Sequence, residues 1–362
     1  MAKVVAACSI QSLKGVRSMD GIYILANDVV FDQLVALLNS IEANISPKMP
    51  ICIIPYNEKL EKVRLEIATR PQVSLFENAA SIQRWEAFAT QVWTSHDRAQ
   101  RAWYDRQLPK VYRIEMHRKL CCFDGEFDRF IYFDADTLAL SSVEPIFQKL
   151  EVYDWVTNDY QYSSELKYIF DAPETDLLKV FDAEKLKSDI FCAGWFASKK
   201  NVFTDETLRS LLTSLKAGES DLLALWGTDQ SLMNYLVLRS QISYYNFAAS
   251  GTVPGSHWSS KFDQRNHVLY DKGQPLTYLH YMSIPSANFT RLCQGEDVAI
   301  PYRDLFLHYR YLKTPHERSQ TLKSPDLVTQ ARSRIAQFRQ QKINNLNHRF
   351  RKLKHQLNQL RG

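Results

Sequence analysis

The sequence predicts an α/β fold built on a mixed, mostly parallel β-sheet with helices on its faces. Short apolar runs rich in β-branched and aromatic residues alternate with stretches whose apolar residues recur at helical spacing. The run at residues 130–133 is apolar throughout, which is typical of a strand that is buried on both faces of a parallel sheet. At 362 residues with 45% hydrophobic content, the chain is long enough to bury a large core.

Strands and helices alternate regularly through the first part of the chain. Predicted strands cover residues 22–26, 50–56, 73–77 and a run ending at Asp134. Helical patterns are found between them, at residues 29–44, 57–69, 85–93 and 113–123. This order predicts βαβ units, in which ligands bind beyond the carboxyl ends of the strands. Asn27, Asp28, Asp134 and Asp136 lie at two such ends, so we expect this part to bind a nucleotide.

The pattern changes after about residue 150. Residues 154–189 are mixed, polar and aromatic, and we expect them to form an insertion over the edge of the sheet. Further elements are a strand within 190–200, a loop entering a helix at 225–240, and a short strand within 277–285. Residues 306–326, which contain Pro315 and Pro325, indicate a connector.

Composition narrows the class of protein. No apolar stretch approaches the roughly 18–20 residues of a membrane-spanning helix, and the first 21 residues lack the continuous apolar block of a secretory signal. The six cysteines show neither CxxC pairs nor zinc-finger spacing, which favours buried thiols in a reducing compartment. We therefore expect a cytoplasmic protein.

The C-terminal segment 327–362 differs sharply in charge from the rest. It carries nine Lys and Arg residues and no acid, whereas the whole chain has a net charge of +5. Apolar residues recur in it at alternating spacings of three and four, as in a heptad pattern: Ile343, Leu346, Phe350, Leu353, Leu357 and Leu360. The pattern predicts a basic amphipathic helix from about Leu327 to Leu360.

Four interpretations of this helix compete. It could join two subunits as a coiled coil, or lie on an anionic membrane surface with its basic face toward the lipid. It could also be an ordinary packed helix with a solvated basic face. Contact with nucleic acid ranks last, because the remainder of the chain has no supporting motif.

Two carboxylates close the apolar run RFIYFDADTLAL at residues 129–140. Side chains at positions i and i+2 of a strand point the same way, so Asp134 and Asp136 would repel each other unless a cation lay between them. Mg²⁺ and Mn²⁺ bind through one or two carboxylates together with substrate phosphates. The alternative is that Asp134 begins a turn or caps a helix while Asp136 is solvated.

The stretch KLCCFDGEFDRFIYFDADTLALSSVEPIF, residues 119–147, resembles the corresponding stretch of the glycogenin-like family 8 of glycosyltransferases. That family has a Lys-Leu pair, an aromatic strand and then Asp-Ala-Asp-Thr-Leu. Other segments follow in the family's order: IYILAND, FCAGWFAS, TDQSLMNYLV and YLHYM. The resemblance spans residues 20–285 and implies the GT-A fold, a Rossmann-like sheet flanked by helices.

The resemblance also implies a division of the chain. Residues 1–305 would form the catalytic domain, with a nucleotide-binding half at about 20–150 and an acceptor and sugar half at about 151–305. The connector 306–326 and the basic helix 327–362 would follow.

The resemblance further implies roles for individual residues. Metal ligands for Mn²⁺ or Mg²⁺ would be Asp134, Asp136 and His280, a mixed nitrogen and oxygen set that suits Mn²⁺ somewhat better. Contacts to the nucleotide-sugar donor would come from six further residues: Ala26, Asn27, Asp28, Lys119, Ala193 and Gly194. Asp229 and Gln230 match the acid–amide pair that faces the transferred sugar in this family.

Each of these residues also has a purely structural interpretation. Asn27 or Asp28 could cap a helix, Asp229 could do the same, Lys119 could lie on the surface, and His280 could be a partly buried histidine with ordinary partners. The capping and nucleotide-binding roles of residues 27 and 28 are compatible with each other.

Two departures from the family pattern concern the donor site. Cys192 stands where the family has an asparagine before Ala-Gly. The family's His-x-x-Gly-x-x-Lys-Pro, whose lysine contacts the diphosphate, reads HYMSIPSANFTR at residues 280–291, without the glycine or the lysine. Arg291 or Lys261 could supply the missing positive charge from a neighbouring loop.

These observations predict a metal-dependent glycosyltransferase that moves a sugar, with retention of configuration, from a nucleoside-diphosphate sugar, most simply a UDP-sugar, to a glycan, protein or lipid acceptor. Its location would be cytoplasmic, or peripheral at the inner face of a membrane. Two alternatives stay open: a sugar-phosphate nucleotidyltransferase, and a catalytically inactive binding or scaffold protein of the same fold. The missing lysine and asparagine favour the second alternative.

Overall fold

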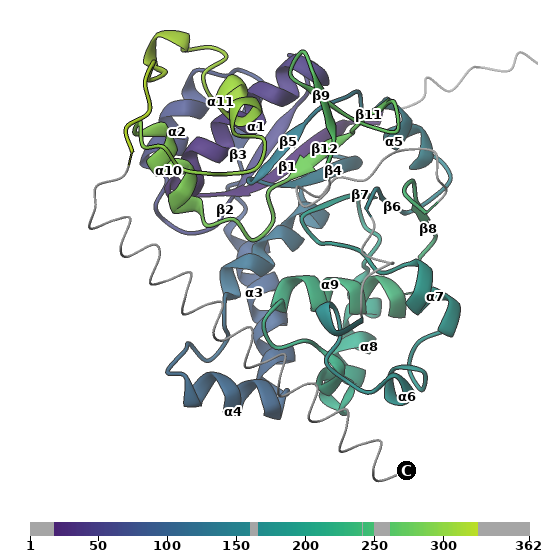
Figure 1. Ribbon diagram of the computed structural model, residues 1–362. Coiled ribbons are helices and arrows are strands. Elements are labelled where there is room, and N and C mark those ends of the chain that lie inside the picture. The colour runs from purple at the N-terminus through teal and green to yellow at the C-terminus, as the bar shows by residue number, and fades with distance from the viewer. Residues whose placement is uncertain (1–17, 160–165, 241, 250–260, 325–362) are drawn as a thin grey trace, which may run out of the picture.

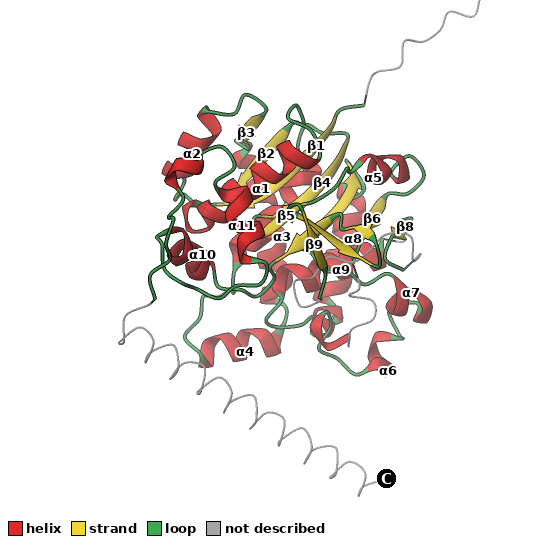
Figure 2. Ribbon diagram, turned by 45° about the horizontal axis from the view of Figure 1, so that its top comes forward, coloured by secondary structure: helices red, strands yellow, loops and turns green. Residues whose placement is uncertain are grey.

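The computed structural model describes residues 18–159, 166–240, 242–249 and 261–324. The centre of this part is a seven-stranded sheet, drawn in yellow in Figure 2. Its strands, in spatial order, are β3 (Val73–Leu75), β2 (Ile51–Pro55), β1 (Asp20–Ala26), β4 (Arg129–Asp134), β7 (Trp195–Lys199), β6 (Trp155–Thr157) and β8 (Tyr244–Asn246). Within this sheet β7 runs antiparallel to both of its neighbours, and all other pairs are parallel.

Helices cover both faces of the sheet (Figure 1). Residues of β1 alternate between two apolar clusters, with Ile22 and Ile24 on one face and Tyr23 and Leu25 on the other. The first face is packed by α1 (Phe31–Asn44), α2 (Glu61–Ala68) and α5 (Glu144–Lys149). The second is packed by α3 (Ala79–Thr94), α4 (Asp97–Asp105), the 3₁₀ helix η2 (Ile114–Asp124), α6 (Glu174–Leu177), α7 (Ala183–Ser188), α8 (Asp205–Lys216) and α9 (Thr228–Arg239). Burial on both faces explains why residues 22–26 of β1, strand β2 and residues 130–133 of β4 are apolar.

Two smaller sheets lie outside the central one. β5 (Thr137–Ala139) pairs antiparallel with β12 (Tyr278–His280). A three-stranded sheet contains β9 (Asp263–Arg265), β10 (Val268–Asp271) and β11 (Gln274–Pro275). The β5–β12 pair places the segment after residue 277 beside the segment that follows β4.

A third apolar cluster joins the C-terminal described residues to the first helix. α10 (Ser286–Cys293) and α11 (Arg303–Arg310) both pack against α1. Phe289 of α10 and Phe306 of α11 contribute aromatic rings to this cluster, with their centroids 4.8 Å apart. The helices α10 and α11 therefore belong to the packed core of the described chain.

Two expectations from the sequence differ from this architecture. Residues 154–189 do not form only an insertion, because Trp155–Thr157 is strand β6 of the main sheet. The connector expected from residue 306 begins inside α11, where Phe306, Leu307 and Tyr309 are buried against α1. Both segments, β6 and the part of α11 after residue 306, are short and rich in aromatic residues. Their secondary structure therefore depends on packing against the rest of the protein and cannot be inferred from the local sequence. The basic helix predicted at 327–362 lies outside the described residues.

Within the described residues, no helix is both long enough and apolar enough to cross a membrane.

Candidate active site

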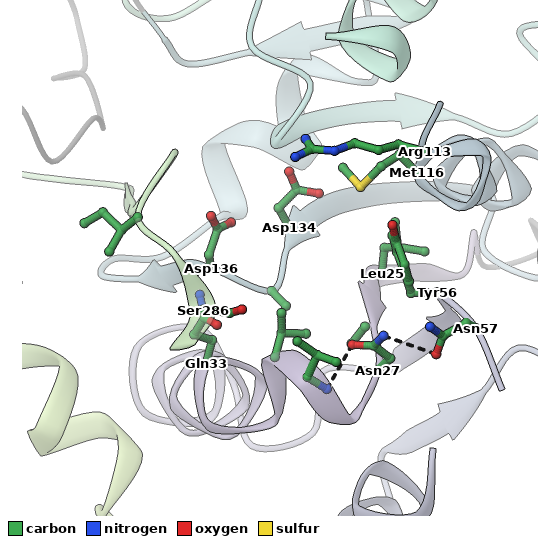
Figure 3. Close-up of a pocket in the computed structure, with 15 residues that line it drawn as sticks. Leu25, Asn27, Gln33, Tyr56, Asn57, Arg113, Met116, Asp134, Asp136 and Ser286 are labelled. Carbon is green, nitrogen blue, oxygen red and sulfur yellow. Dashed lines mark hydrogen bonds between the residues drawn. The ribbon is translucent and has the colours of Figure 1, made fainter. Parts of the chain in front are cut away.

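A cavity of about 470 Å³ opens at the carboxyl ends of β1, β2 and β4 (Figure 3). Its walls include Leu25 and Ala26 at the end of β1, and Tyr56 and Asn57 just beyond β2. The residues after β4 complete this wall, beginning with Asp134. This is the edge of the sheet at which parallel α/β folds bind ligands.

Asp134, Asp136 and His280 form the one group of three or more potential metal-ligating side chains found in the described residues. β4 ends at Asp134, and β5 begins three residues later at Thr137, which is paired with His280 of β12. The hydrogen bond from the Tyr281 N–H to the Asp136 carbonyl, 2.9 Å long, fixes this register. As a result, one ligand atom from each of the three side chains lies within 4.8 Å of the others.

The space beside this group depends on Gly194. The Gly194 carbonyl accepts a 2.8 Å hydrogen bond from the Asp134 N–H, so the two backbones lie in contact. A Cβ at position 194 would come within 2.3 Å of His280 Cε1 and 3.0 Å of Asp134 Oδ2. Only glycine leaves this volume open. Two carboxylates and one imidazole around such a volume fit Mn²⁺ or Mg²⁺.

The charges of the three side chains also favour a cation. Burial raises the pKa of Asp134, and the neighbouring Asp136 carboxylate raises it further, against the attraction of Lys119. His280 Nε2 lies 3.2 Å from Asp136 Oδ1. Although burial opposes the charged imidazole, Asp136 outweighs it and raises the pKa of His280 well above its ordinary value. A divalent cation would relieve the repulsion between the two carboxylates.

Lys119 is completely buried and is the centre of a second network, which we call the lysine network: Lys119, Tyr132, Asp134 and Asp229. Its Nζ lies 2.7 Å from Asp229 Oδ2 and 3.3 Å from Asp134 Oδ1, and donates to the Ala193 carbonyl at 3.2 Å. The Tyr132 hydroxyl donates to the same Asp134 oxygen at 2.6 Å. Burial opposes the charge on Lys119, but the two carboxylates outweigh it and raise the pKa of Lys119. The interpretation of Lys119 as a surface lysine is therefore wrong.

Asp229 and Gln230 lie in the first turn of α9. Burial opposes the ionised form of Asp229, but Lys119 outweighs it and lowers the pKa of Asp229. The Gln230 side chain accepts a hydrogen bond from the Ala193 N–H at 3.3 Å and donates to the Tyr168 carbonyl at 3.2 Å. Gln230 therefore contacts Ala193 directly, whereas Asp229 is linked to the Ala193 carbonyl through Lys119.

The three residues predicted to contact the nucleotide do not lie together. Ala26 and Asn27 line the cavity. Asn27 accepts from the Val29 N–H at 3.1 Å and donates to Asn57, so it combines a capping role with a place in the cavity wall. Asp28 does not line the cavity, because its carboxylate accepts from the N–H groups of Lys62 and Val63 at the start of α2.

Cys192 contacts the metal-ligating group through His280. Its Sγ lies 3.7 Å from His280 Nδ1, and its N–H donates to Asp159 at 3.2 Å. The thiol thus lies behind a potential metal ligand, where the resembling family has an amide side chain.

Several cavity residues could not be found by sequence reasoning. Arg113 lines the cavity with its guanidinium directed toward Asp134 (Figure 3), and its backbone adopts the left-handed conformation at φ 55°. Gln33 of α1 and Ser286 of α10 line the wall nearest Asp136. Arg291, which we considered as a replacement for the family's lysine, forms a 2.7 Å ion pair with Glu296 and does not line the cavity. No sequence pattern distinguishes Arg113 from the other arginines nearby.

No protein-family model and no curated protein sequence matches the chain. Solved structures of glycosyltransferases do match. The galactosyltransferase LgtC, solved in complex with donor and acceptor sugar analogs, is 13% identical over 82% of this chain and 96% of its own, with a TM-score of 0.50.

Two further matches have lower scores. The bifunctional glycosyltransferase WbbM is 16% identical over 83% of this chain, with a TM-score of 0.48. The glycosyltransferase GlyE of Streptococcus pneumoniae TIGR4 is 12% identical over 83% of this chain, with a TM-score of 0.43. The chain spans 51% and 62% of these two proteins, respectively.

The LgtC match and the topology of the mixed sheet together show the GT-A glycosyltransferase fold and confirm the predicted fold class. At these identities a match shows the fold alone. Membership of glycosyltransferase family 8 therefore stays a prediction.

Proposed function

We propose that this protein transfers a sugar from a nucleoside-diphosphate sugar to an acceptor in a reaction that depends on a divalent cation. The observation that carries the proposal is the convergence of Asp134, Asp136 and His280 beside a cavity at the carboxyl edge of a GT-A sheet. LgtC, which shares this fold, is a galactosyltransferase solved with donor and acceptor sugar analogs. We infer the same class of reaction here, with a UDP-sugar as the first donor to test.

In this proposal Asp134, Asp136 and His280 hold Mn²⁺ or Mg²⁺. The cation would neutralise negative charge on the departing diphosphate. Arg113 lies on the same cavity wall as Asp134 and is exposed, so its guanidinium can reach the diphosphate directly. This role takes the place of the lysine that the family motif would have supplied.

The sugar would lie between Gly194 and the start of α9. Gly194 leaves room for a close approach, and Lys119 orients Asp229 by a 2.7 Å ion pair. This ion pair engages the Asp229 carboxylate and so disfavours it as a covalent nucleophile. We therefore favour attack by the acceptor on the same face from which the diphosphate leaves, with retention of configuration and with Gln230 beside the sugar.

Membership of family 8, the cytoplasmic or peripheral-membrane location, and the glycan, protein or lipid acceptor are parts of the same proposal. A homodimer or an anionic membrane surface would engage the basic segment 327–362. We expect no specific nucleic-acid partner.

The decisive test is calorimetric titration of UDP and of GDP into the full chain, with and without Mn²⁺. We expect binding that requires Mn²⁺ and that is lost in Asp136→Asn, a change that removes one negative charge with little change in size. The matched control is Asp97→Asn, an exposed aspartate of α4 that does not line the cavity. Binding of neither nucleotide under any metal condition would contradict the proposal and favour a scaffold protein of the same fold.

A further inference from the structure

Three large aromatic side chains are well exposed in the described chain, and all three belong to the part of the protein that packs on the α9 side of the sheet. Tyr104 of α4 is 83% exposed, Tyr168 is 57% exposed and Trp226, just before α9, is 41% exposed. The Tyr168 carbonyl accepts a 3.2 Å hydrogen bond from Gln230 in the first turn of α9. Exposed aromatic rings beside a candidate active site indicate a surface that binds a ligand.

Trp226 belongs to a row of side chains that begins at the cavity. Arg113, which lines the cavity, places its guanidinium 5.1 Å from the centroid of the Tyr112 ring. The rings of Tyr112 and Trp226 meet edge to face with their centroids 5.8 Å apart, and the Arg106 guanidinium lies 4.2 Å from the Trp226 centroid. We call Tyr112, Trp226 and Arg106 the aromatic row. It leads from the cavity wall at Arg113 to the end of α4.

Buried side chains hold the aromatic row in place. The Trp103 indole N–H donates to the Leu225 carbonyl at 3.3 Å, and the Thr228 hydroxyl donates to the Tyr112 carbonyl at 3.3 Å. Trp103 and Thr228 are both buried, so the backbone on either side of Trp226 is anchored while the indole itself is exposed. An exposed ring on an anchored backbone loses little conformational entropy when a ligand covers it.

The aromatic row lies in a basic part of an otherwise acidic body. Residues 98–113 contain five Lys or Arg residues and one acid, whereas residues 1–326 as a whole carry a net negative charge. Within the described chain, Arg106 and Arg113 contact aromatic rings and form no ion pair. Stacking occupies the face of a guanidinium and leaves its in-plane N–H groups for a carboxylate or a phosphate. An occupant with acidic groups therefore complements this surface.

We propose that the aromatic row binds the acceptor, and that the acceptor is an anionic glycan, a saccharide that carries carboxylate or phosphate groups. This inference rests on the proposed function and narrows its acceptor. The apolar face of a sugar ring packs on Trp226 and Tyr112, and Arg106 binds the acidic group. Because Trp226 directly precedes α9, one end of a saccharide on the row lies beside Gln230 and the sugar to be transferred.

The experiment uses an array of immobilised oligosaccharides in matched pairs, each pair containing a carboxylated or phosphorylated glycan and its neutral counterpart. Affinities are measured for the full chain, for Trp226→Ala and for Arg106→Gln. We expect wild type to prefer the acidic member of at least one pair. Trp226→Ala should weaken binding to both members of that pair about tenfold, whereas Arg106→Gln should weaken binding to the acidic member alone by about that factor.

Tyr104→Ala and Arg209→Gln are the matched controls, because they change an exposed tyrosine of α4 and an exposed arginine of α8 that lie outside the row. Both should bind glycans as wild type does. Calorimetric titration of UDP with Mn²⁺ should give wild-type affinity in Trp226→Ala and Arg106→Gln, since both residues are exposed and neither lines the cavity. This titration also shows that each variant is folded.

Equal binding to the acidic and neutral members of every pair, or unaltered binding of acidic glycans in both variants, would overturn the proposal. With UDP binding intact, the proposed function would then stand. Tighter binding to single-stranded oligothymidylate or to phosphatidylglycerol vesicles than to any acidic glycan would also overturn it. If wild type binds neither UDP nor GDP, the proposed function fails, and the acceptor role of the row fails with it.

Discussion

The two sides of the candidate site satisfy their polar groups in opposite ways. In the lysine network the charges of Lys119, Asp134 and Asp229 pair with one another inside the protein. In the cavity, Arg113 and Gln33 line open volume, and neither side chain forms a hydrogen bond or an ion pair with the described residues. The Arg113 guanidinium lies over the ring of the adjacent Tyr112, 5.1 Å from its centroid.

This difference indicates that the lysine network has a structural role, whereas the polar groups of the cavity are available to bind a ligand. Internal pairing holds the network in one geometry before any substrate arrives, at the expense of removing charges from water. In the proposed function, the cavity instead keeps hydrogen-bond donors available for the diphosphate of the nucleotide sugar. Substitutions on the first side should therefore change stability, and substitutions on the second side should change binding.

The largest effect should follow from Lys119→Met, which removes the buried charge while keeping a side chain of similar length. Asp229 and Asp134 would be left buried without compensation, and we expect the free energy of unfolding to fall by about 3–5 kcal/mol. Urea denaturation measures this change. Lys199→Met is the control, since its 3.0 Å pair with Asp154 is partly exposed and should contribute about 1 kcal/mol or less. If Lys119→Met lowered the free energy of unfolding by less than about 1 kcal/mol, the lysine network would contribute no more to stability than the cavity residues do, and the comparison would fail.

A smaller effect is expected for Arg113→Ala, and it should be on ligand affinity and not on stability. UDP affinity in Mn²⁺ should fall about tenfold, or about 1.4 kcal/mol, because a charge-assisted contact to the diphosphate is lost. Stability should hardly change, since Arg113 is exposed and its side chain lies over the ring of its neighbour Tyr112. Arg113→Gly should lose the same affinity but be about 1 kcal/mol more stable than Arg113→Ala, because φ is 55° at this position. Unaltered UDP binding in both variants would remove Arg113 from the donor site.

The smallest effect is expected for an ion-pair network that belongs to neither the lysine network nor the cavity. It serves as a comparison for the other two. Glu42 of α1 lies against Arg70 and Lys313. Burial opposes its ionised form, but Lys313 and Arg70 outweigh it and lower the pKa of Glu42. The stabilisation from this group is present above its ordinary pKa and is lost as pH falls through the lowered value.

Glu42→Gln keeps an oxygen that can accept from Arg70, and Arg70 keeps its ion pair with Glu66, so the change should cost only about 1 kcal/mol at neutral pH. The difference from wild type should shrink as pH falls below the ordinary glutamate pKa of 4.5. Thermal unfolding followed at several pH values measures this trend. A difference that grows at low pH would contradict the sign of the pKa shift.

Much of the fold could be predicted from the sequence because its central strands β1, β2 and β4 are apolar on both faces and are followed by polar residues. The runs at 22–26 and 50–56, and the run ending at Asp134, are strands β1, β2 and β4. Strand β6 has three residues, Trp155–Thr157, too few for a period to be visible. Helix α11 was missed because its buried face became clear only through its packing on α1.

For the site, sequence reasoning could name residue types at strand ends but not the directions of their side chains. The resemblance to the glycosyltransferase family, and not the pattern of residue types, implied that Asp134, Asp136 and His280 belong together, and the structure brings one ligand atom of each within 4.8 Å of the others. Sequence reasoning could not show that Asp28 turns toward α2, since both Asn27 and Asp28 suit either role. Arg113 depends on a left-handed backbone conformation, which arginine sequence context does not reveal.

Asp134 belongs to both sides of the site, and its two oxygen atoms are divided between them. Oδ1 accepts from Tyr132 and pairs with Lys119, while Oδ2 faces the space beside Gly194. In the proposed function, a cation bound at Oδ2 would weaken the attraction between Oδ1 and Lys119 and would strengthen the pairing of that lysine with Asp229. Since coupling free energies are reciprocal, the cation and the sugar would alter each other's affinity by the same factor. One carboxylate would thus make the two halves of the site cooperative without any movement of a domain.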